Sequence, residues 1–522
     1  MRINQVKSGV MLSYASILLS TVISLIYTPI MLSHLGTSEY GVYNVVLPII
    51  SYLNLLNFGL GSAYVRYSLR AMVEHDHKRM AKLNGMFFSI YLILGTLILV
   101  IGSFLAYHGD VVFGKKLTAD EIALGKTLLQ IMSITAAISM PLTIFDSNVM
   151  IHERYVFQKI VAMTKSVLNP LLCIPLLLIG FRSIAITLVA LAVTLLCGGL
   201  NVFYCVRKLD MTFSFRFRRA DFLLMRDIFG YTLYVFIGII VDEINWGIDR
   251  LMLGWLHGTF AVTIYVVGAQ LNLYYLSFAN AISGVLTPRV HKLIAAKRPM
   301  SELDDLFIRI GRIQFILMVC ILLGFVAVGR PFVIRWAGGS EYGAAYYIAL
   351  ILFLTTLFPS IQNIGLEIQR AKNMHKFRSL VYFAVAIGNI LLTIPLARRW
   401  QGLGAAIGTV IATIIGNVIL MNWYYHKHIG LDIPRFWKNI VNLIPSMLLP
   451  AAAAVLIALF APVLGYLSIV LWGAIFVVIY GLTLWRYGLN PYEHDLITGL
   501  LARILPGKTG QKAITFLNRL HR

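Results

Sequence analysis

Long apolar stretches, separated by short polar loops, run through the whole chain. Each is long enough for an α-helix that crosses a bilayer, which needs about 20 apolar residues, and there are about fourteen of them. The pattern therefore predicts an all-α, polytopic membrane protein. The predicted spans are 9–33, 42–66, 84–107, 123–148, 158–180, 184–205, 229–256, 261–286, 311–334, 345–369, 377–397, 403–425, 441–461 and 466–485.

Basic residues gather in alternate loops between these spans. The loops after even-numbered spans, with the two termini, hold about 35 of the 44 Lys and Arg residues. Cytoplasmic loops are enriched in Lys and Arg, so we expect both termini in the cytoplasm. The net charge of +22 is explained by these loops, and we expect no nucleic-acid partner.

The composition excludes a soluble or a disordered protein, because 59% of the residues are hydrophobic and only 13% are charged. The four cysteines lie in or beside apolar spans without the spacing of a metal site or a disulfide framework. No motif of a nucleophile, a phosphate-binding loop or a zinc peptidase is present. We therefore expect no metal, no cofactor and no enzymatic activity.

The chain repeats itself, which predicts how the spans are organised. Residues at a shift of 220 match in type, and they pair Phe157 with Phe377, Asn169 with Asn389 and Pro175 with Pro395. Spans 1–6 and 7–12 therefore look like two copies with the same orientation, related by a pseudo-twofold axis along the membrane normal, with a cleft between them. The expected divisions are 1–210 (first six-helix bundle), 211–227 (cytoplasmic interfacial linker), 228–430 (second bundle), 431–487 (spans 13 and 14) and 488–522 (cytoplasmic amphipathic tail).

Two polar segments flank the second copy. Thr212 to Arg219 alternates aromatic and basic residues, which favours a position at the lipid headgroups, with arginines on anionic lipid. Asn490 to Glu493 has the form of a helix capping box with proline at the first helical position. An apolar stripe follows it, so we expect an amphipathic helix on the inner leaflet.

The seventh span carries four charges within an otherwise apolar stretch: Asp242, Glu243, Asp249 and Arg250. A charge near the middle of a span costs roughly 3 kcal/mol, so these groups need partners or a wet cavity. At 100° per residue all four share one side of the helix. They either form an internal ion-pair network or handle a substrate or an ion.

Other cations lie near the predicted cytoplasmic ends of spans. Arg66 and Arg70 follow span 2, Arg289 holds a similar place after span 8, and Lys165 lies about two turns inside span 5. Each could anchor its helix by reaching to the headgroups. The alternative is a cationic ring at the inner mouth of the cleft that holds a phosphate.

Asp146 in span 4 and Glu367 in span 10 are the remaining acids at membrane depth. They could pair with Arg154 and Arg370 near the cytoplasmic face, or take part in ion coupling. Pro29, near the external end of span 1, could bend that helix and gate the cleft.

Several stretches resemble the polysaccharide flippases, the Wzx-type branch of the multidrug/oligosaccharidyl-lipid/polysaccharide exporter (MOP) superfamily. They are residues 26–49 (IYTPIMLSHLGTSEYGVYNVVLPI), 57–67 (NFGLGSAYVRY), 249–251, 402–412 (GLGAAIGTVIA) and 422–437 (NWYYHKHIGLDIPRFW). The resemblance covers essentially the whole chain. It implies two six-helix bundles around a central cavity, alternating access, and a place in the bacterial cytoplasmic (inner) membrane.

The resemblance also implies a cargo and partners. The cargo would be an undecaprenyl-pyrophosphate-linked oligosaccharide, moved from the cytoplasmic to the outer leaflet for O-antigen, capsule or exopolysaccharide synthesis. Membrane lipids and polysaccharide polymerase or assembly proteins would be the partners.

By position, the resemblance gives the pyrophosphate to Arg66, Arg250 and Arg289, with Arg70 and Lys165 behind them. The acids Asp242, Glu243, Asp249, Asp146 and Glu367 would couple transport to H⁺ or Na⁺ or form a charge network.

Two other functions remain open. A cation-coupled drug or metabolite exporter of the same superfamily would need an acidic, less basic cavity, which Asp242 and Asp249 favour and Arg66 and Arg289 oppose. A scaffold in a polysaccharide assembly complex would transport nothing.

Replacing Arg66 or Arg289 with alanine is expected to abolish flipping and leave folding intact, because a phosphate-binding charge is lost. Lysine at either position should partly preserve transport if simple charge is enough, and fail if a two-pronged grip on phosphate is needed. A vesicle assay that follows a lipid-linked saccharide measures this. Normal transport by both alanine variants would remove these residues from the site.

Overall fold

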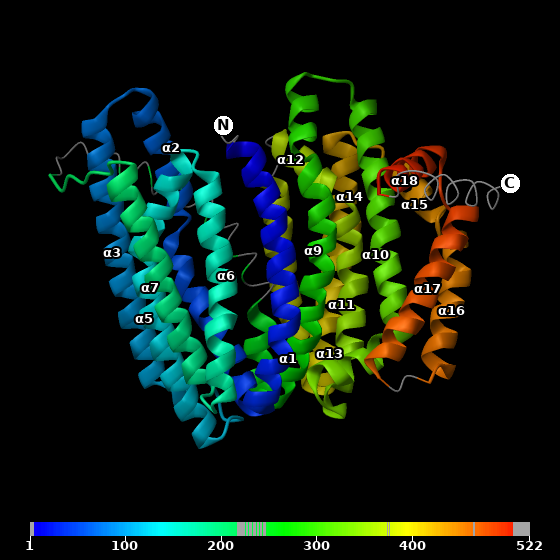
Figure 1. Cartoon of the computed structure of the whole chain (residues 1–522), viewed down its shortest axis with the longest axis horizontal. Helices are drawn as coiled ribbons and strands as arrows, with labels where there is room; N and C mark the ends of the chain where they lie inside the picture. Colours follow the sequence, from blue (N-terminus) through cyan, green and yellow to red (C-terminus); the bar gives the residue numbers. More distant parts are fainter. Residues whose placement is uncertain are drawn as a thin grey trace. The chain divides into compact units, whose positions relative to one another are not determined.

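The computed structural model describes residues 5–216, the single positions 225, 228, 232, 236, 240 and 243, and residues 247–372, 374, 376–462 and 465–504. Within these ranges the chain forms helices and turns and no strand (Figure 1). The prediction of an all-α protein is therefore confirmed.

Ten helical stretches of the described residues are long and apolar enough to cross a membrane, or eleven if the bent pair Ile433–Val441 and Ile444–Phe460 is one span. The protein is thus a multi-pass membrane protein. Two of the ten stretches, Ala15–Val73 and Leu380–Ile429, each contain two of the predicted spans. Most of 229–246 lies outside the described residues, so the number fourteen stays a prediction.

Non-helical backbone marks where the merged spans turn. In α1 (Gln5–Asn54) the break is at Gly36, with φ 69° and ψ −179°. This positive φ favours glycine, because other residues rarely adopt it. In α13 (Lys376–Thr413) the break is at Trp400 and Gln401. Both breaks fall between predicted spans, as the hydrophobic pattern indicates.

The chain divides into two compact units, Met1–Val266 with Tyr382–Gly408, and Val267–Val381 with Thr409–Arg522. We call these unit 1 and unit 2. Their boundaries fall inside α9 and α13 rather than at the predicted linker, and the division into bundles 1–210 and 228–430 stays a prediction. The further helices of unit 1 are α2 (Leu60–Val73), α3 (His77–Tyr107), α4 (Gly109–Val112), α5 (Ala119–Ile151), α6 (Tyr155–Leu178) and α7 (Ser183–Lys208).

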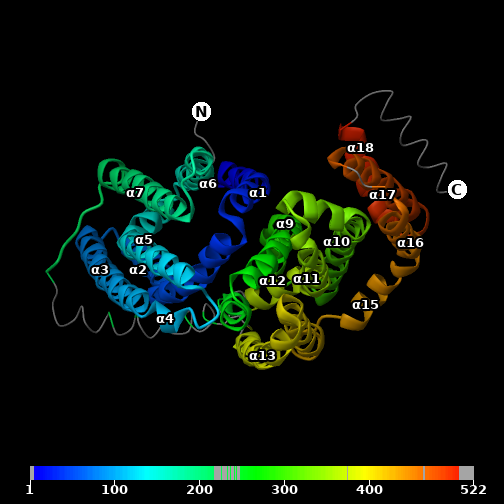
Figure 2. The same cartoon turned by 90° about the horizontal axis from the view of Figure 1, so that it is seen from below.

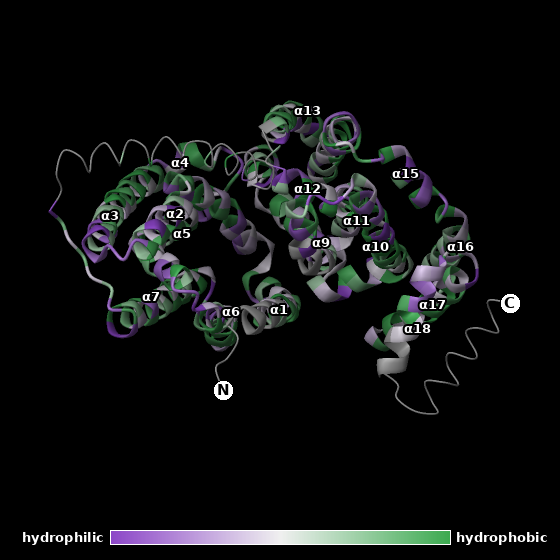
Figure 3. Ribbon diagram, turned by 90° about the horizontal axis from the view of Figure 1, so that it is seen from above, coloured by the Kyte–Doolittle hydropathy of each residue, from purple (hydrophilic) through white to green (hydrophobic). Residues whose placement is uncertain are grey.

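In unit 1, α5 lies against α3 and α7, and α6 lies against α1 (Figure 2). The core contains large, fully buried side chains such as Tyr64, Phe87 and Tyr91. The outward side of α3 is apolar as well: Ile93 is 66% exposed and Val100 is 60% exposed. Hydrophobic colouring along α3 agrees with this (Figure 3). Lipid tails accept such a surface, whereas water would not.

The described start of the linker is held by α3. The Asn84 amide donates to the Thr212 carbonyl at 2.8 Å, and the Ser214 amide donates to the Ala81 carbonyl at 2.9 Å. The Phe213 ring lies against Phe88 at 5.6 Å. Phe213 therefore contacts protein, not only the headgroup region that the sequence pattern favoured. Residues 217–219 lie outside the described part.

Unit 2 contains most of α9 (Thr259–Ala295). Its other helices are α10 (Met300–Ala337), α11 (Gly343–Ile361), α12 (Asn363–Ala371), α14 (Met421–Tyr424), α15 (Ile433–Val441), α16 (Ile444–Phe460), α17 (Tyr466–Tyr487) and α18 (Pro491–Ile504). π-helical turns occupy Ile414–Leu420 and Tyr425–Ile429. A one-residue break at Gln362 separates α11 from α12. The Gln362 side-chain Nε2 donates to Asn422 Oδ1 at 2.7 Å. This bond connects the break to the π-helical region.

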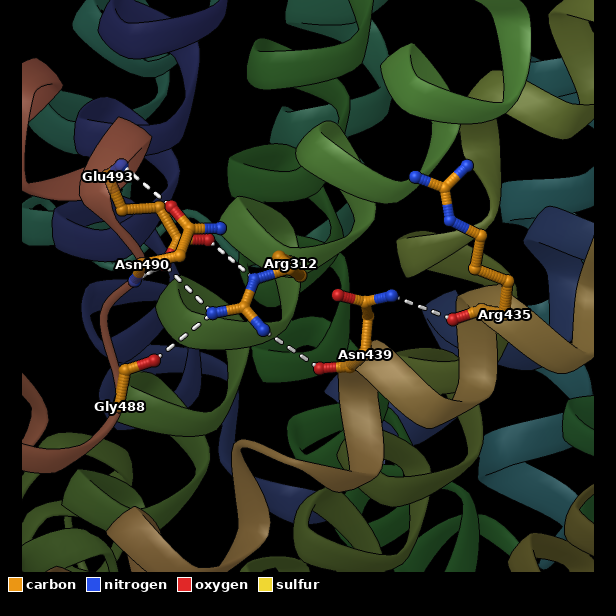
Figure 4. Close-up of polar contacts among 6 residues, drawn as sticks. All are labelled: Arg312, Arg435, Asn439, Gly488, Asn490 and Glu493. Atoms are coloured by element: carbon orange, nitrogen blue, oxygen red, sulfur yellow. Dashed lines mark hydrogen bonds and ion pairs between the residues drawn. The ribbon is translucent and has the colours of Figure 1, made fainter. Parts of the chain in front are cut away.

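A buried ion pair joins α18 to α10 within unit 2. Arg312 of α10 donates to both carboxylate oxygens of Glu493 at 2.7 and 2.9 Å, and also to the carbonyls of Asn439 and Gly488 (Figure 4). The two side chains are only 7% and 4% exposed. Asn490 and Glu493 exchange hydrogen bonds of 2.9 Å, so the predicted capping box is confirmed. Glu493 thus caps α18 and joins it to α10.

Replacing Arg312 with methionine should destabilise the protein by roughly 3–5 kcal/mol, because Glu493 would remain buried without its partner. The apparent melting temperature in detergent measures this. Arg435→Met is the matched control, since the Arg435–Asp305 pair is 51% and 45% exposed and exposed pairs contribute little. Equal melting temperatures for the two variants would contradict a structural role for the buried pair.

Candidate functional site

The charged segment of the seventh span lies inside unit 1. Residues 247–257 are helical, and Asp249 is buried at 2% exposure, while Glu243 and Arg250 are half-buried. The Tyr265 hydroxyl of α9 donates to Asp249 Oδ2 at 2.6 Å. Asp242 lies outside the described residues. The three described charges, Glu243, Asp249 and Arg250, are therefore all buried or half-buried.

Three tyrosines lie near the charges of this segment. Tyr43 and Tyr265 lie within electrostatic range of Arg250, and Tyr52 lies within range of Glu243 and Asp249. We call Tyr43, Tyr52, Asp249, Arg250 and Tyr265 the Arg250 layer. Arg250 Nε and the Tyr52 hydroxyl are buried and make no hydrogen bond with any described residue. Buried polar groups are nearly always hydrogen-bonded, so these donors are suited to bind an anionic or hydroxylated ligand.

A tight turn brings the members of this layer together. The helix 247–257 ends at Gly258, whose φ of 80° favours glycine, and α9 begins at Thr259. The chain therefore reverses, and Asp249 and Tyr265 face each other across the hairpin. A side chain at Gly258 would also approach the Lys116 carbonyl oxygen at 3.2 Å.

A second polar cluster lies beside the first, at the end of unit 1 that holds the Gly36 break. Glu121 Oε1 accepts hydrogen bonds from Ser38 Oγ and Thr259 Oγ1, both at 2.6 Å. Thr263 Oγ1 donates to the Thr37 carbonyl at 2.7 Å. We call these five residues the Glu121 latch, since they join the Gly36 turn, the start of α5 and the start of α9.

The latch and the layer are neighbours along two helices. Tyr265 follows Thr259 by six residues and Tyr43 follows Ser38 by five, which corresponds to about 8–9 Å along a helix. The Trp255 indole also donates to the Val112 carbonyl at 2.7 Å. The Gly36 end of unit 1 is therefore held together by hydrogen bonds directly above the Arg250 layer. The positive-inside pattern predicts that this end is external.

The membrane-depth acids outside the layer have other partners. Asn201 of α7 donates to Asp146, and Lys165 of α6 is the cation that acts on it electrostatically. The alternative pairing of Asp146 with Arg154 is therefore wrong, because α7 presents an amide at closer range. Glu367 pairs with Arg370 at 2.8 Å, and this alternative is confirmed.

The predicted cations do not all gather around Arg250. Arg66 and Arg70 are exposed on α2, and Arg70 pairs with Glu74 at 3.0 Å. Arg66 belongs to α2, which is separated from Tyr43 of α1 by the 3₁₀ turn Leu55–Asn57 and by positive φ angles at Phe58 and Gly59. Arg289 belongs to unit 2, where it is exposed on α9. Their role in binding pyrophosphate stays a prediction.

Pro29 lies within α1, and the non-helical position of that helix is Gly36. A gating role for Pro29 stays a prediction.

The protein family described as "Polysaccharide biosynthesis protein" matches residues 6–294, which is more than half of the chain. The chain belongs to this family. The resemblance noted in its sequence is therefore confirmed. A curated relative, the "Uncharacterized membrane protein EpsK" of Bacillus subtilis (strain 168), is 23% identical over 444 residues, covering 81% of this chain and 84% of the relative.

Two solved structures share the fold of this family member. The "Lipid II flippase MurJ, inward closed conformation" has a TM-score of 0.71 and 15% identity, covering 92% of this chain and 98% of that one. An inward-facing "multidrug resistance MATE family transporter of the MOP superfamily" has a TM-score of 0.61 and 14% identity, covering 80% and 96%. The chain therefore shares its fold with these two proteins.

Sequence reasoning did not identify Glu121, Ser38 and Thr259 as partners. The spacing Thr118-x-x-Glu121 marks a capping box, which the structure contains. That signal locates the start of α5 but not the contacts with residues 83 and 138 positions away. Asn201, the partner of Asp146, was missed for the same reason.

Replacing Glu121 with alanine should open the Gly36 end, because the hydrogen bonds from Ser38 and Thr259 that hold this end are lost, each contributing about 1.5–3 kcal/mol. The bond from the Thr118 amide, which caps α5, is lost as well. A cysteine in place of the buried Val262, in a chain otherwise free of cysteine, reports opening through its reaction with an impermeant maleimide. We expect labelling at least about tenfold faster. Asp120→Ala, at the exposed neighbouring carboxylate, is the control. Unchanged labelling after Glu121→Ala would rule out the latch as a barrier.

Proposed function

We propose that this family member flips an undecaprenyl-pyrophosphate-linked oligosaccharide from the cytoplasmic to the outer leaflet for surface polysaccharide synthesis. Family membership and the MOP fold support a transporter of polysaccharide precursors. The observation that carries the proposal is Arg250, a half-buried guanidinium whose Nε is shielded from solvent and not hydrogen-bonded by the described residues. An anionic headgroup is the ligand that such a group binds best.

The physical problem is to move a pyrophosphate across a hydrocarbon layer about 30 Å thick. A charge in hydrocarbon is costly unless an opposite charge and hydrogen-bond donors accompany it. In the proposed cycle the Arg250 layer supplies the guanidinium and the tyrosine hydroxyls, while the lipid tail stays in the bilayer. Arginine serves this purpose better than lysine, because its planar fork matches two phosphate oxygens.

In the proposed cycle the Glu121 latch sets the direction of transport. It closes the Gly36 end next to the Arg250 layer, so the pyrophosphate approaches from the opposite end and leaves when the latch opens. Arg66, Arg70 and Lys165 of unit 1 and Arg289 of unit 2 would attract the anionic headgroup on the cytoplasmic side. In this scheme both termini are cytoplasmic, and transport follows an alternating-access mechanism.

Ion coupling would use the acids of unit 1. Asp249 is hydrogen-bonded to Tyr265 within the layer, and Asp146 lies between Asn201 and Lys165. Protonation or Na⁺ binding at either carboxylate would change the local charge while the headgroup passes Arg250. Polysaccharide polymerase or assembly proteins remain proposed partners.

A cation-coupled drug or metabolite exporter is the second candidate. The burial of Asp249 next to Glu243 favours it, since buried acids attract soluble cations. Arg250 opposes it, because the guanidinium in the same layer repels such cations.

Replacing Arg250 with alanine should reduce flipping of an undecaprenyl-pyrophosphate-linked saccharide in proteoliposomes at least about tenfold, because a charge-assisted contact with phosphate contributes about 1.5–3 kcal/mol. Arg250→Lys should retain part of the activity. Arg435→Ala, at an exposed ion pair of unit 2, is the matched control, with folding checked by gel filtration.

Wild-type flipping by Arg250→Ala would contradict this headgroup site. Transport of a soluble cation, with no flipping by the wild-type protein, would favour the exporter. Binding of the saccharide assembly proteins with transport of neither cargo would identify a scaffold.

A further inference from the structure

A ladder of polar side-chain contacts runs between α9 and the α11–α12 pair in unit 2. Its first rung joins Thr356 Oγ1 to Asn272 Oδ1 at 2.9 Å. In the second rung, Asn363 Nδ2 lies 3.4 Å from Asn280 Oδ1 and 3.2 Å from Ser283 Oγ. The third rung sets His291 Nε2 3.9 Å from Glu367 Oε2.

The ladder widens towards the C-terminal ends of α9 and α12, as the three rung distances show. Exposure rises in the same direction: Asn272 is 1% exposed, whereas Asn280 is exposed and the His291 side chain is 51% exposed. The first rung is therefore a packed contact between helices. In the second rung, the exposed Asn280 and the half-buried Asn363 form an accessible polar edge at the side of α9, whereas Ser283 is buried and donates to the Ala279 carbonyl at 3.0 Å.

The second rung has hydrogen-bonding capacity that the described residues do not use. An amide side chain offers two donor hydrogens and an oxygen that accepts. Asn280 Oδ1 accepts one long hydrogen bond, and no described residue accepts a hydrogen bond from the Asn280 NH₂ group. The Asn363 NH₂ group donates, and no described residue donates to Asn363 Oδ1. Neighbouring donors and acceptors without charge match the vicinal hydroxyls of a sugar.

Arg289 does not belong to this edge. It follows Asn280 by nine residues, which is half a turn around the helix axis at 100° per residue. The edge formed by Asn280 and Asn363 is thus neutral, whereas the charges of the Arg250 layer belong to unit 1. Such a neutral edge suits the sugars of a lipid-linked cargo, and it does not suit the pyrophosphate.

We propose that Asn280 and Asn363 form a subsite for the sugar residues of the cargo, an inference that rests on the proposed function. Amides on two helices hold hydroxyl groups of the saccharide in place of water. The subsite adds affinity for the glycosylated lipid and none for the pyrophosphate carrier alone. It therefore contributes to the choice of cargo.

The other ligand that neutral oxygens attract is Na⁺, and the second rung favours a sugar over it. A sodium site uses oxygen ligands alone, so the NH₂ group of Asn280 would have no role in it. The carboxylate nearest along α12, Glu367, is already paired with Arg370. A site that needs both donors and acceptors fits hydroxyl groups better.

The test compares two lipids that differ only in their sugars. The probes are undecaprenyl pyrophosphate and the lipid-linked repeat unit extracted from a polymerase-deficient strain of the source organism. Binding to the purified full chain is measured for wild type and for the Asn280→Ala/Asn363→Ala variant. Loss of two neutral hydrogen bonds should weaken binding of the glycosylated lipid about tenfold and leave binding of undecaprenyl pyrophosphate unchanged.

Controls separate the sugar subsite from folding and from the headgroup site. Asn442→Ala removes an exposed amide of unit 2 and should bind both lipids as wild type does. If the double variant does not fold, Asn280→Ala alone is used, since this side chain is exposed, and about a threefold to fivefold loss is expected. Arg250→Ala should weaken binding of both lipids equally.

Three outcomes overturn the proposal. Equal binding of the two lipids by wild type, or an equal loss for both in the double variant, removes the subsite and leaves the proposed flippase function standing. A loss seen in sodium chloride but absent in potassium chloride identifies a cation site. Wild type that binds neither lipid overturns both the subsite and the proposed function.

Discussion

The cost of placing charge in a low-dielectric environment governs this structure. Asp249 is buried, and Arg250 lies half-buried beside it in the predicted seventh span. Such groups are tolerated only with partners, and the hairpin at Gly258 supplies Tyr265 as one of them. In this arrangement the Arg250 guanidinium keeps an Nε donor that makes no hydrogen bond with the described residues. A protein that needed only stability would do as well with apolar residues there.

The Glu121 latch lies next to Arg250 and is held by hydrogen bonds that can break. Its hydrogen bonds join three segments far apart in the sequence, and each bond can break without disturbing a helix. The packed core around Tyr64 and Phe87 offers no such freedom, because interiors are close-packed. Motion is therefore expected to concentrate where short polar contacts, rather than interlocked side chains, hold helices together.

The two units use different polar chemistry. Unit 1 has charged groups at depth, with tyrosines near Arg250 and the Asp146–Asn201 contact beside Lys165. Unit 2 has amides and hydroxyls on α9 and α12, and its buried Arg312–Glu493 pair is fully used to hold α18. The pairing of Arg312 with Glu493 shows, by contrast, what a purely structural charge looks like: both partners are buried and every contact is internal.

The sequence by itself determined the all-α membrane class, the family, the turns near Gly36 and Gln401, and the cap at Asn490. These features depend on local pattern: hydrophobic length, glycine geometry and capping spacing act within a few residues. Only the tertiary structure decided that Glu121 meets Ser38 and Thr259, and that Asp146 meets Asn201 instead of Arg154. Contacts between distant residues depend on how helices rotate and pack against each other, and a single sequence does not record that rotation.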